Sequence, residues 1–312
     1  VGKSAVSVNL AIALAQKGHS VLLCDFDFGG ANLHTLLGLK NNHAGLGNFI
    51  YKQNKSLLEL LQQTQIPNLK FIAGDCLFPG TANMDFFSKK KIIKELNSFD
   101  YEYIIIDLGG GTSFNTLDFY LMTYNSILVT TPELTSVMNA YSFLKSAAFR
   151  FFKQQFSPRS DERTAIQQFL TSGESGTEAS FTSLVETICS RFPETGLKAK
   201  KELAKLHPQV ILNSSSVVQD LEMAKRLRSL AEKKISIQLK FLAVLPKDDI
   251  VAVAVAKRTP VCILAPESPF ALGIQKTAGR VENFEYYFND SLTNEAAEID
   301  KLYDDYSYTK GI

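Results

Sequence analysis

Short apolar runs alternate with longer segments of helical periodicity along the first half of the chain. Residues 5–17 predict an amphipathic helix, and Gly18 follows it as a helix-ending residue. Buried strands are predicted at residues 20–26, 69–73, 103–108, 126–131, 209–213, 239–245 and 261–264. This alternation is typical of βαβ units, so we expect an α/β fold with a doubly wound, mostly parallel sheet flanked by helices.

Composition excludes several classes of protein. The 312 residues carry a net charge of only +1, so no global field marks the chain as a nucleic-acid binder. The four cysteines are scattered without a CxxC pair, which gives no signal for a zinc or iron–sulfur site. No apolar run reaches the roughly 18–20 residues that span a bilayer, and no secretory signal is present. We therefore expect a cytoplasmic protein.

The first residues of the chain have the chemistry of a phosphate-binding loop. Val1, Gly2, Lys3 and Ser4 match the end of the pattern GxxxxGK[ST] and lead directly into the predicted helix at Ala5. Gly2 would let backbone amides approach phosphates, Lys3 would reach the β- and γ-phosphates, and Ser4 would place its hydroxyl on Mg²⁺. The alternative is a plain Gly–Lys turn before a helix. Because the chain starts inside this motif without a methionine, we expect further residues upstream.

Acidic residues end two of the predicted buried strands. Asp25 and Asp27 close the strand at residues 20–26, with Asn32 shortly after, and Asp107 closes the strand at residues 103–108. In an open α/β sheet, ligands bind beyond the carboxyl ends of the strands, so these side chains and the phosphate loop would meet at one place. Asp107 fits a Walker B carboxylate that holds magnesium through its water shell. The alternative for each aspartate is a cap or turn residue.

These motifs together resemble the MinD/ParA family of deviant Walker A P-loop ATPases. GKS opens the helix, DFDFGGAN lies at the second strand of the family's fold and IIIDLGGGTS lies at the Walker B strand, in the family's order. Later segments are similar to the FlhG/FleN branch of MinD-like flagellar number regulators: TPELTS at residues 131–136, Asn213 at a strand end, and LPKDD at residues 245–249. The resemblance covers about residues 1–145 and 208–279.

The resemblance implies ATP hydrolysis with Mg²⁺. On the family pattern the catalytic residues are Asp27, which positions the attacking water, Asn32, which helps to orient that water, and Lys3, which reaches the phosphates. Asp25 and Asp107 support the magnesium shell alongside Ser4. Positioning and charge neutralisation of this kind supply most of the catalysis in phosphoryl transfer.

The resemblance also implies an adenine site and a switch. The base would be held by the strand-end Asn213 and the loop of Pro246, Lys247 and Asp248, and Gly110 beside Asp107 would report the γ-phosphate. Family members form ATP-dependent sandwich dimers in which a lysine three residues before Val1 reaches the partner's phosphates. We therefore expect a slow ATPase that cycles between ATP and ADP, self-associates as a homodimer and answers to a further protein partner or activator.

Two segments depart from the family pattern. Residues 145–208 predict a helical insertion within a P-loop ATPase domain at residues 1–280. Residues 281–312 are predicted to be an acidic tail, which contains eight acidic residues and two lysines. A tail of this sign argues against direct binding to anionic lipid, so association with the membrane or cell pole is expected through a partner.

Three classes of function fit the chain. The first is a regulator of the number or placement of flagella or another cellular machine. The second is a ParA-like DNA-partitioning ATPase that uses a basic face, although such residues are more often a solvated helix face. The basic residues are Lys198, Lys200, Lys201, Lys205, Lys225, Arg226, Arg228, Lys233 and Lys234. The third is a metallocluster carrier, which the absence of CxxC disfavours. We favour the first.

Overall fold

The structure is a computed structural model that describes residues 1–40, 43–51, 53, 55–74, 84–171, 181–216 and 219–283. Most of the predicted acidic tail, from residue 284 on, lies outside the described residues, as does Cys76. None of the helices within these ranges combines the length and apolar character needed to cross a membrane.

The strands form two sheets. Their bounds are β1 (Val21–Phe26), β2 (Gln62–Gln63), β3 (Leu69–Ile72), β4 (Tyr103–Leu108), β5 (Ile127–Thr130), β6 (Gln209–Ser215) and β7 (Lys240–Pro246). The first sheet has the order β2-β3-β1-β4 and the second has the order β5-β6-β7. Of the pairs, β1 is parallel to both β3 and β4, β5 is parallel to β6, and β2 is antiparallel to β3. The mostly parallel α/β architecture predicted from the sequence is confirmed.

Thirteen α-helices and one 3-10 helix are found in the described ranges. Their bounds are α1 (Lys3–Gln16), α2 (Leu33–Leu36), α3 (Leu46–Ile50), η1 (Leu57–Leu60), α4 (Phe86–Leu96), α5 (Phe114–Tyr120), α6 (Leu134–Gln154), α7 (Asp161–Thr171), α8 (Phe181–Arg191), α9 (Pro193–Leu203), α10 (Asp220–Ile235), α11 (Ile250–Ala256), α12 (Val261–Leu264) and α13 (Pro269–Glu282). Helices α6 to α9 cover most of residues 145–208, the stretch predicted to be a helical insertion.

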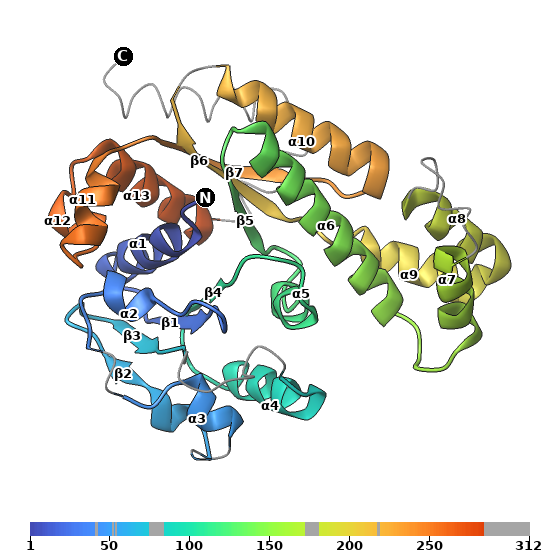
Figure 1. Ribbon diagram of the computed structural model, residues 1–312, viewed down its shortest axis with the longest axis horizontal. Coiled ribbons are helices and arrows are strands. Elements are labelled where there is room, and N and C mark those ends of the chain that lie inside the picture. The colour runs from blue at the N-terminus through green and yellow to red at the C-terminus, as the bar shows by residue number, and fades with distance from the viewer. Residues whose placement is uncertain are drawn as a thin grey trace. The chain divides into compact units, whose positions relative to one another are not determined.

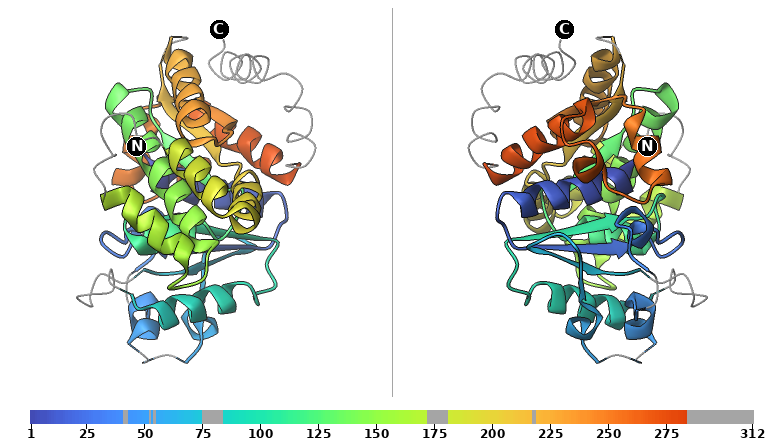
Figure 2. Two further views of the ribbon diagram at one scale, coloured as in Figure 1. Left: turned by 90° about the vertical axis from the view of Figure 1, so that its right-hand side faces the viewer. Right: turned by 90° about the vertical axis from the view of Figure 1, so that its left-hand side faces the viewer.

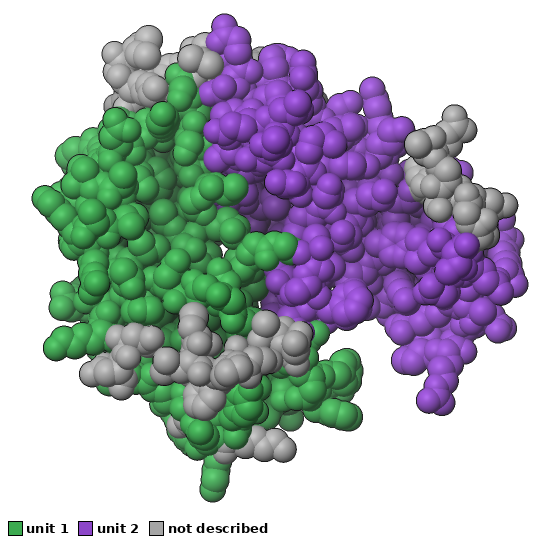
Figure 3. Space-filling view, viewed as in Figure 1, with its two compact units in different colours: residues 1–111, 213–216, 242–312 green, residues 112–212, 217–241 purple. Residues whose placement is uncertain are grey.

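The chain divides into two compact units, which Figure 3 colours separately. The first comprises Val1–Gly111, Asn213–Ser216 and Leu242–Ile312, and the second comprises Thr112–Leu212 and Val217–Phe241. Every residue predicted to bind phosphate, magnesium or adenine lies in the first unit. The candidate site can therefore be described within that unit alone.

Helices cover both faces of the first sheet. In Figures 1 and 2, α1 and α13 lie on one face, and α3 and α4 lie on the other. All six residues of β1 are buried, as expected for a central parallel strand covered on both sides. Helix α1 is buried on most of its surface because it packs against β1, β4 and α13. It ends at Gln16, and Gly18 follows shortly after with a φ of 102° that favours glycine, as predicted.

One predicted strand is wrong. Residues 261–264 form the short helix α12, which begins after Pro260. The amides of Ile263 and Leu264 donate to the Pro260 carbonyl at 3.0 and 2.9 Å, and buried Cys262 donates its amide to the Asn9 side chain at 2.9 Å. An apolar run of four residues has no periodicity that distinguishes a strand from a buried helical turn.

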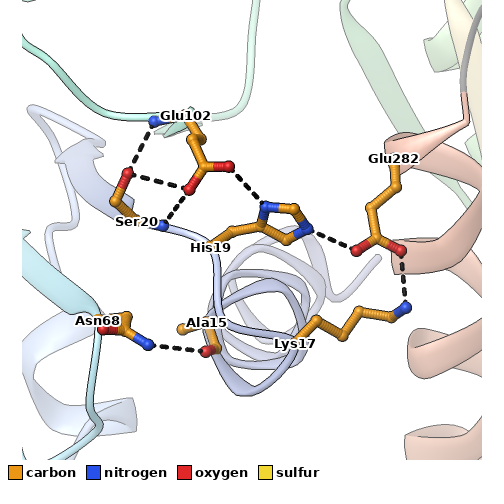
Figure 4. Close-up of polar contacts among 7 residues, drawn as sticks. All are labelled: Ala15, Lys17, His19, Ser20, Asn68, Glu102 and Glu282. Atoms are coloured by element: carbon orange, nitrogen blue, oxygen red, sulfur yellow. Dashed lines mark hydrogen bonds and ion pairs between the residues drawn. The ribbon is translucent and has the colours of Figure 1, made fainter.

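A polar network ties the carboxyl end of α1 to the amino ends of the strands and to the end of α13 (Figure 4). The two ring nitrogens of His19 lie 2.9 Å from Glu102 Oε1 and 2.6 Å from Glu282 Oε1. Lys17 Nζ donates to Glu282 Oε2 at 2.6 Å, and the Ser20 amide donates to Glu102 Oε2 at 2.8 Å. Hydrogen bonds to these carboxylates raise the pKa of His19 above 6.5 and lower the pKa values of Glu102 and Glu282.

Candidate functional site

The amino end of α1 is shaped to receive an anion. Gly2 precedes the helix with a φ of 82°, a left-handed conformation that a side chain would strain. A Cβ at Gly2 would also lie 2.5 Å from Asn213 Nδ2. Gly2, the residue before the helix, makes no side-chain cap, so the first backbone N–H groups and the positive end of the helix dipole are suited to an anion. Phosphate groups bind at such helix ends.

Asp107 joins the amino end of α1 to the carboxyl end of β4. Its side chain is buried, 3% exposed, and both carboxylate oxygens accept hydrogen bonds from α1. Ser4 Oγ donates to Oδ2 at 2.7 Å and Ser7 Oγ donates to Oδ1 at 2.9 Å. Burial raises the pKa of Asp107, while the two serine hydroxyls and the charge of Lys3 act in the opposite direction. The structure therefore places the phosphate loop and the predicted Walker B aspartate side by side.

Asp25 lies beside Asp107 because β1 and β4 run parallel in register, with Asp25 paired to Asp107. Its side chain is 1% exposed, and its two oxygens accept the amides of Asp27 at 3.2 Å and Leu33 at 3.0 Å. Burial raises the pKa of Asp25 to about 6, partly offset by those two backbone hydrogen bonds. Asp25 thus fixes the turn after β1 while keeping a carboxylate that a nearby cation would stabilise.

Asp27 follows β1 and is half-buried. Its Oδ1 accepts the Gly29 amide at 3.2 Å, which closes a turn typical of aspartate. A Cβ at Gly109 would lie 2.7 Å from this same oxygen, so the glycines after β4 leave the room that the Asp27 carboxylate fills. Gly110 lies close to Lys3, whose Nζ would be 4.0 Å from a Cβ there. Asp27, Lys3 and Gly110 therefore border one region of the first unit.

The predicted adenine residues gather at the carboxyl ends of β6 and β7. Asn213 uses Nδ2 to donate to the Val1 carbonyl at 2.9 Å. Pro246 ends β7, and the amide of exposed Lys247 donates to the Ser215 carbonyl at 2.8 Å.

Asp248 belongs to the same loop and holds two helices. Its Oδ1 accepts the Ile250 amide at 3.1 Å at the start of α11. Its Oδ2 accepts the Phe270 amide at 3.0 Å at the start of α13. The loop geometry is therefore fixed by these bonds, and contact with adenine stays a prediction.

Asn32 and Ala5 occupy positions at the starts of helices. Asn32 precedes α2, and its side chain does not cap the helix. Its role in orienting water stays a prediction. The Ala5 carbonyl accepts Asn9 Nδ2 at 2.8 Å.

The charges of the site fit a divalent cation shared with phosphate. The carboxylates of Asp27 and Asp107 act on Asp25 through their charges, and the positive charge of Lys3 acts on Asp107. Among the described residues, however, no three His, Cys, Asp or Glu side chains are grouped so as to hold a metal ion by themselves. Mg²⁺ characteristically takes one or two carboxylates and completes its shell with phosphate oxygens and water. Ser4, Asp25 and Asp107 are the residues that would support its shell.

Two contacts of the site were missed by the sequence analysis. Ser7 bonds Asp107, and its position three residues after Ser4 places the two hydroxyls on one helix face, a spacing that could have indicated the contact. The bond from Asn213 to Val1 joins residues 212 positions apart, and no sequence signal identifies it.

The fold is that of the P-loop NTPases, a class of proteins that use nucleotide and Mg²⁺. Residues 1–151 match the sequence model of the ParA family, described as "NUBPL iron-transfer P-loop NTPase". Residues 1–151 are thus similar to the ParA family of P-loop NTPases.

Curated relatives match the same part of the chain. The septum site-determining protein MinD of Helicobacter pylori is 31% identical over 143 residues, which cover 45% of this chain and 52% of MinD. The flagellum site-determining protein YlxH of the same organism is 32% identical over 151 residues, which cover 46% of this chain and 49% of YlxH. The chain thus spans about half the length of the curated relatives that it matches.

A solved structure extends the likeness in fold over most of the chain. MinD of Pyrococcus horikoshii, solved as a complex with Mg-ADP, superposes with a TM-score of 0.61 at 21% identity. The match covers 91% of this chain and 92% of that one. The MinD P-loop NTPase fold is therefore shared beyond residue 151.

Proposed function

We propose that this chain binds ATP with Mg²⁺ and hydrolyses it slowly, and that its ATP-bound state is a homodimer that signals to a partner protein. The observation that carries the proposal is the contact of Asp107 with the amino end of α1. Ser4 Oγ lies 2.7 Å from Asp107 Oδ2, and Asp25 is the strand neighbour of Asp107. A helix end suited to phosphate and two buried carboxylates suited to Mg²⁺ therefore occupy one place.

The residues of this site divide the work of phosphoryl transfer. Bound Mg²⁺ would neutralise the charge of the β- and γ-phosphates. The backbone amides of residues 1–5 and Lys3 would bind the phosphates, and Ser4, Asp25 and Asp107 would support the metal shell. Asp27 would hold the attacking water, with Asn32 beside it, and Gly110 would sense the γ-phosphate. Because Asp27 and Asn32 only position the water, loss of either one slows hydrolysis more than it weakens nucleotide binding.

The cellular role that we favour is regulation of the number or placement of flagella or another machine. Support comes from the relatives named for this work, YlxH for flagellum site determination and MinD for septum site determination. We place the protein in the cytoplasm, with recruitment to the membrane or cell pole through a partner.

The central experiment measures the mass of the full-length protein by light scattering with ATP, with ADP and without nucleotide. We expect about twice the monomer mass only when ATP and Mg²⁺ are present. Phosphate should be released at a slow, steady rate under the same condition. Tight ATP binding without any change of mass would reject the dimer. Failure to bind either nucleotide would reject the whole proposal. A pull-down with the ATP-bound dimer then captures the partner.

The alternative function is a ParA-like ATPase that binds DNA. Exposed lysines on α9 and α10 support it, whereas Arg228 does not contribute to a surface, because it is 8% exposed and lies 5.1 Å from the Phe241 ring centroid. DNA retention with ATP, compared at low and high salt, distinguishes the two functions. Retention that falls steeply with salt would favour DNA binding.

A metallocluster carrier is the third class, to which the words "iron-transfer" in the family description point. Among the described cysteines, Cys24 and Cys262 are 0% and 1% exposed, and burial raises the pKa of both thiols. Buried thiols of this kind are inert toward metal. Iron analysis of the anaerobically purified protein tests this class, and stoichiometric iron would revive it.

A further inference from the structure

Ser7 has a contact that the roles assigned so far do not use. Its Oγ donates to Asp107 Oδ1 at 2.9 Å, while Ser4 Oγ donates to Asp107 Oδ2 at 2.7 Å. Ser4 and Ser7 are three residues apart on α1, so their side chains lie on the same face of the helix. Together the two hydroxyls hold both oxygens of one buried carboxylate.

The two serines differ in what else they can reach. Ser4 is in the first turn of α1, where a hydroxyl can contact a metal bound to phosphate. Ser7 lies about 4.5 Å further along the helix axis, given a rise of about 1.5 Å per residue, and faces the sheet at Asp107. A Ser4 hydroxyl that offers a lone pair to a cation can still donate its proton to Asp107 Oδ2, while Ser7 holds the other oxygen of the same carboxylate.

We propose that Ser7 is a positioning residue for magnesium, whose hydroxyl fixes the Asp107 carboxylate so that Oδ2 faces Ser4 and the metal. The inference rests on the proposed function, because it assigns Ser7 to the magnesium that ATP brings. Groups that orient a metal's carboxylate partners typically change metal affinity by about 10- to 100-fold when they are removed. Asp107 acts through the metal's water shell, so the lower end of that range applies.

The test is a magnesium titration of nucleotide binding. Fluorescently labelled ADP is bound first in EDTA and then at increasing Mg²⁺, with wild type, Ser7→Ala and Ser7→Thr. We expect Ser7→Ala to raise the half-saturating Mg²⁺ concentration about tenfold while its ADP affinity in EDTA equals that of wild type. Ser7→Thr keeps a hydroxyl and should restore the wild-type magnesium dependence.

A matched control removes a buried hydroxyl elsewhere in the same unit. Thr277 is 0% exposed, and its Oγ1 donates only within α13, to the Gly273 carbonyl at 2.7 Å. Thr277→Val loses this bond and keeps the volume, so its magnesium dependence should be that of wild type. If Ser7→Ala does not fold, Ser7→Cys keeps the size with a weaker donor and should give a smaller shift in the same direction.

The outcomes separate the inference from the proposed function. An unchanged magnesium dependence in Ser7→Ala or Ser7→Cys overturns the inference. So does an equal loss of ADP affinity with and without Mg²⁺, since that would mean a purely structural role. Wild-type protein that binds no nucleotide in either condition would instead overturn the proposed function.

Discussion

The two ends of α1 meet carboxylates in opposite electrostatic states. At the amino end, Asp25 and Asp107 are almost completely buried, and burial raises both pKa values. At the carboxyl end, the side chain of Glu102 is 56% exposed and that of Glu282 is 19% exposed, and hydrogen bonds from His19 and Lys17 lower their pKa values. At the carboxyl end, the basic side chains compensate the charges of the glutamates. At the amino end, the aspartates hold negative charge that a bound cation would stabilise, and this difference distinguishes a binding site from a purely structural network.

The largest expected effect comes from removing the positively charged Lys3 side chain at the amino end of α1. Lys3→Ala should lower ATP affinity at least about 100-fold, because the phosphates lose their charge-assisted partner. Lys17→Ala removes a lysine from the other end of the same helix and should leave the affinity as in wild type. Calorimetric titration with a slowly hydrolysed ATP analogue measures both. Equal losses in the two variants would erase the distinction between the ends.

Removing the carboxylate assigned to water separates binding from chemistry. Asp27→Ala should keep nucleotide affinity and lower the hydrolysis rate about 10²- to 10⁴-fold, the range for a positioned acid–base group. The ATP-bound dimer should then accumulate, which light scattering and phosphate release follow together. A normal hydrolysis rate in Asp27→Ala would show that another group holds the water.

A methyl group can displace the same carboxylate without removing it. The Cβ of Gly109→Ala would lie 2.7 Å from Asp27 Oδ1 and 3.1 Å from Asp27 Cγ, so the side chain must shift. Misplacing a catalytic group by about 1 Å can lower the reaction rate up to about 100-fold. We therefore expect Gly109→Ala to slow hydrolysis about 10- to 100-fold without changing nucleotide affinity. Gly279→Ala, on α13, meets only Glu282 Oε2 at 4.0 Å and is the control. Matching rates in the two variants would argue against the close packing of Gly109 on Asp27.

The smallest expected effect concerns His19 at the carboxyl end of α1 and changes only the stability of the protein. The pKa of His19 is raised above 6.5, so its contribution is fully present below pH 6.5 and is lost as the pH rises through the higher folded pKa. Between pH 6 and pH 8.5, the free energy of unfolding measured in urea should therefore fall by about 0.5 kcal/mol more for wild type than for His19→Gln. Nucleotide affinity should be equal in both. A wild-type pH dependence that persists in His19→Gln would assign it to other groups.

The sequence predicted those features that depend on local pattern. Strand-end aspartates can be assigned because parallel strands deliver their carboxyl ends to one edge, and Asp25 and Asp107 lie there as register partners. The helix at residues 261–264 was predicted as a strand, because four apolar residues carry no period. Arg228 was counted with a basic surface, although it packs on Phe241 from the next strand, β7. Contacts of that kind depend on tertiary packing, which residue type and spacing do not specify.

The hydrogen bond between Asn213 and Val1 has a consequence for the order of events during translation. The two residues are 212 positions apart, yet the amide of one holds the backbone of the other at the entrance to α1. A nascent chain that has emerged only through β4 can already pair its first strands, but its phosphate loop still lacks this support. The loop would gain this hydrogen bond only after β6 has left the ribosome, so a prematurely terminated chain would contain the motif without the support that Asn213 gives it.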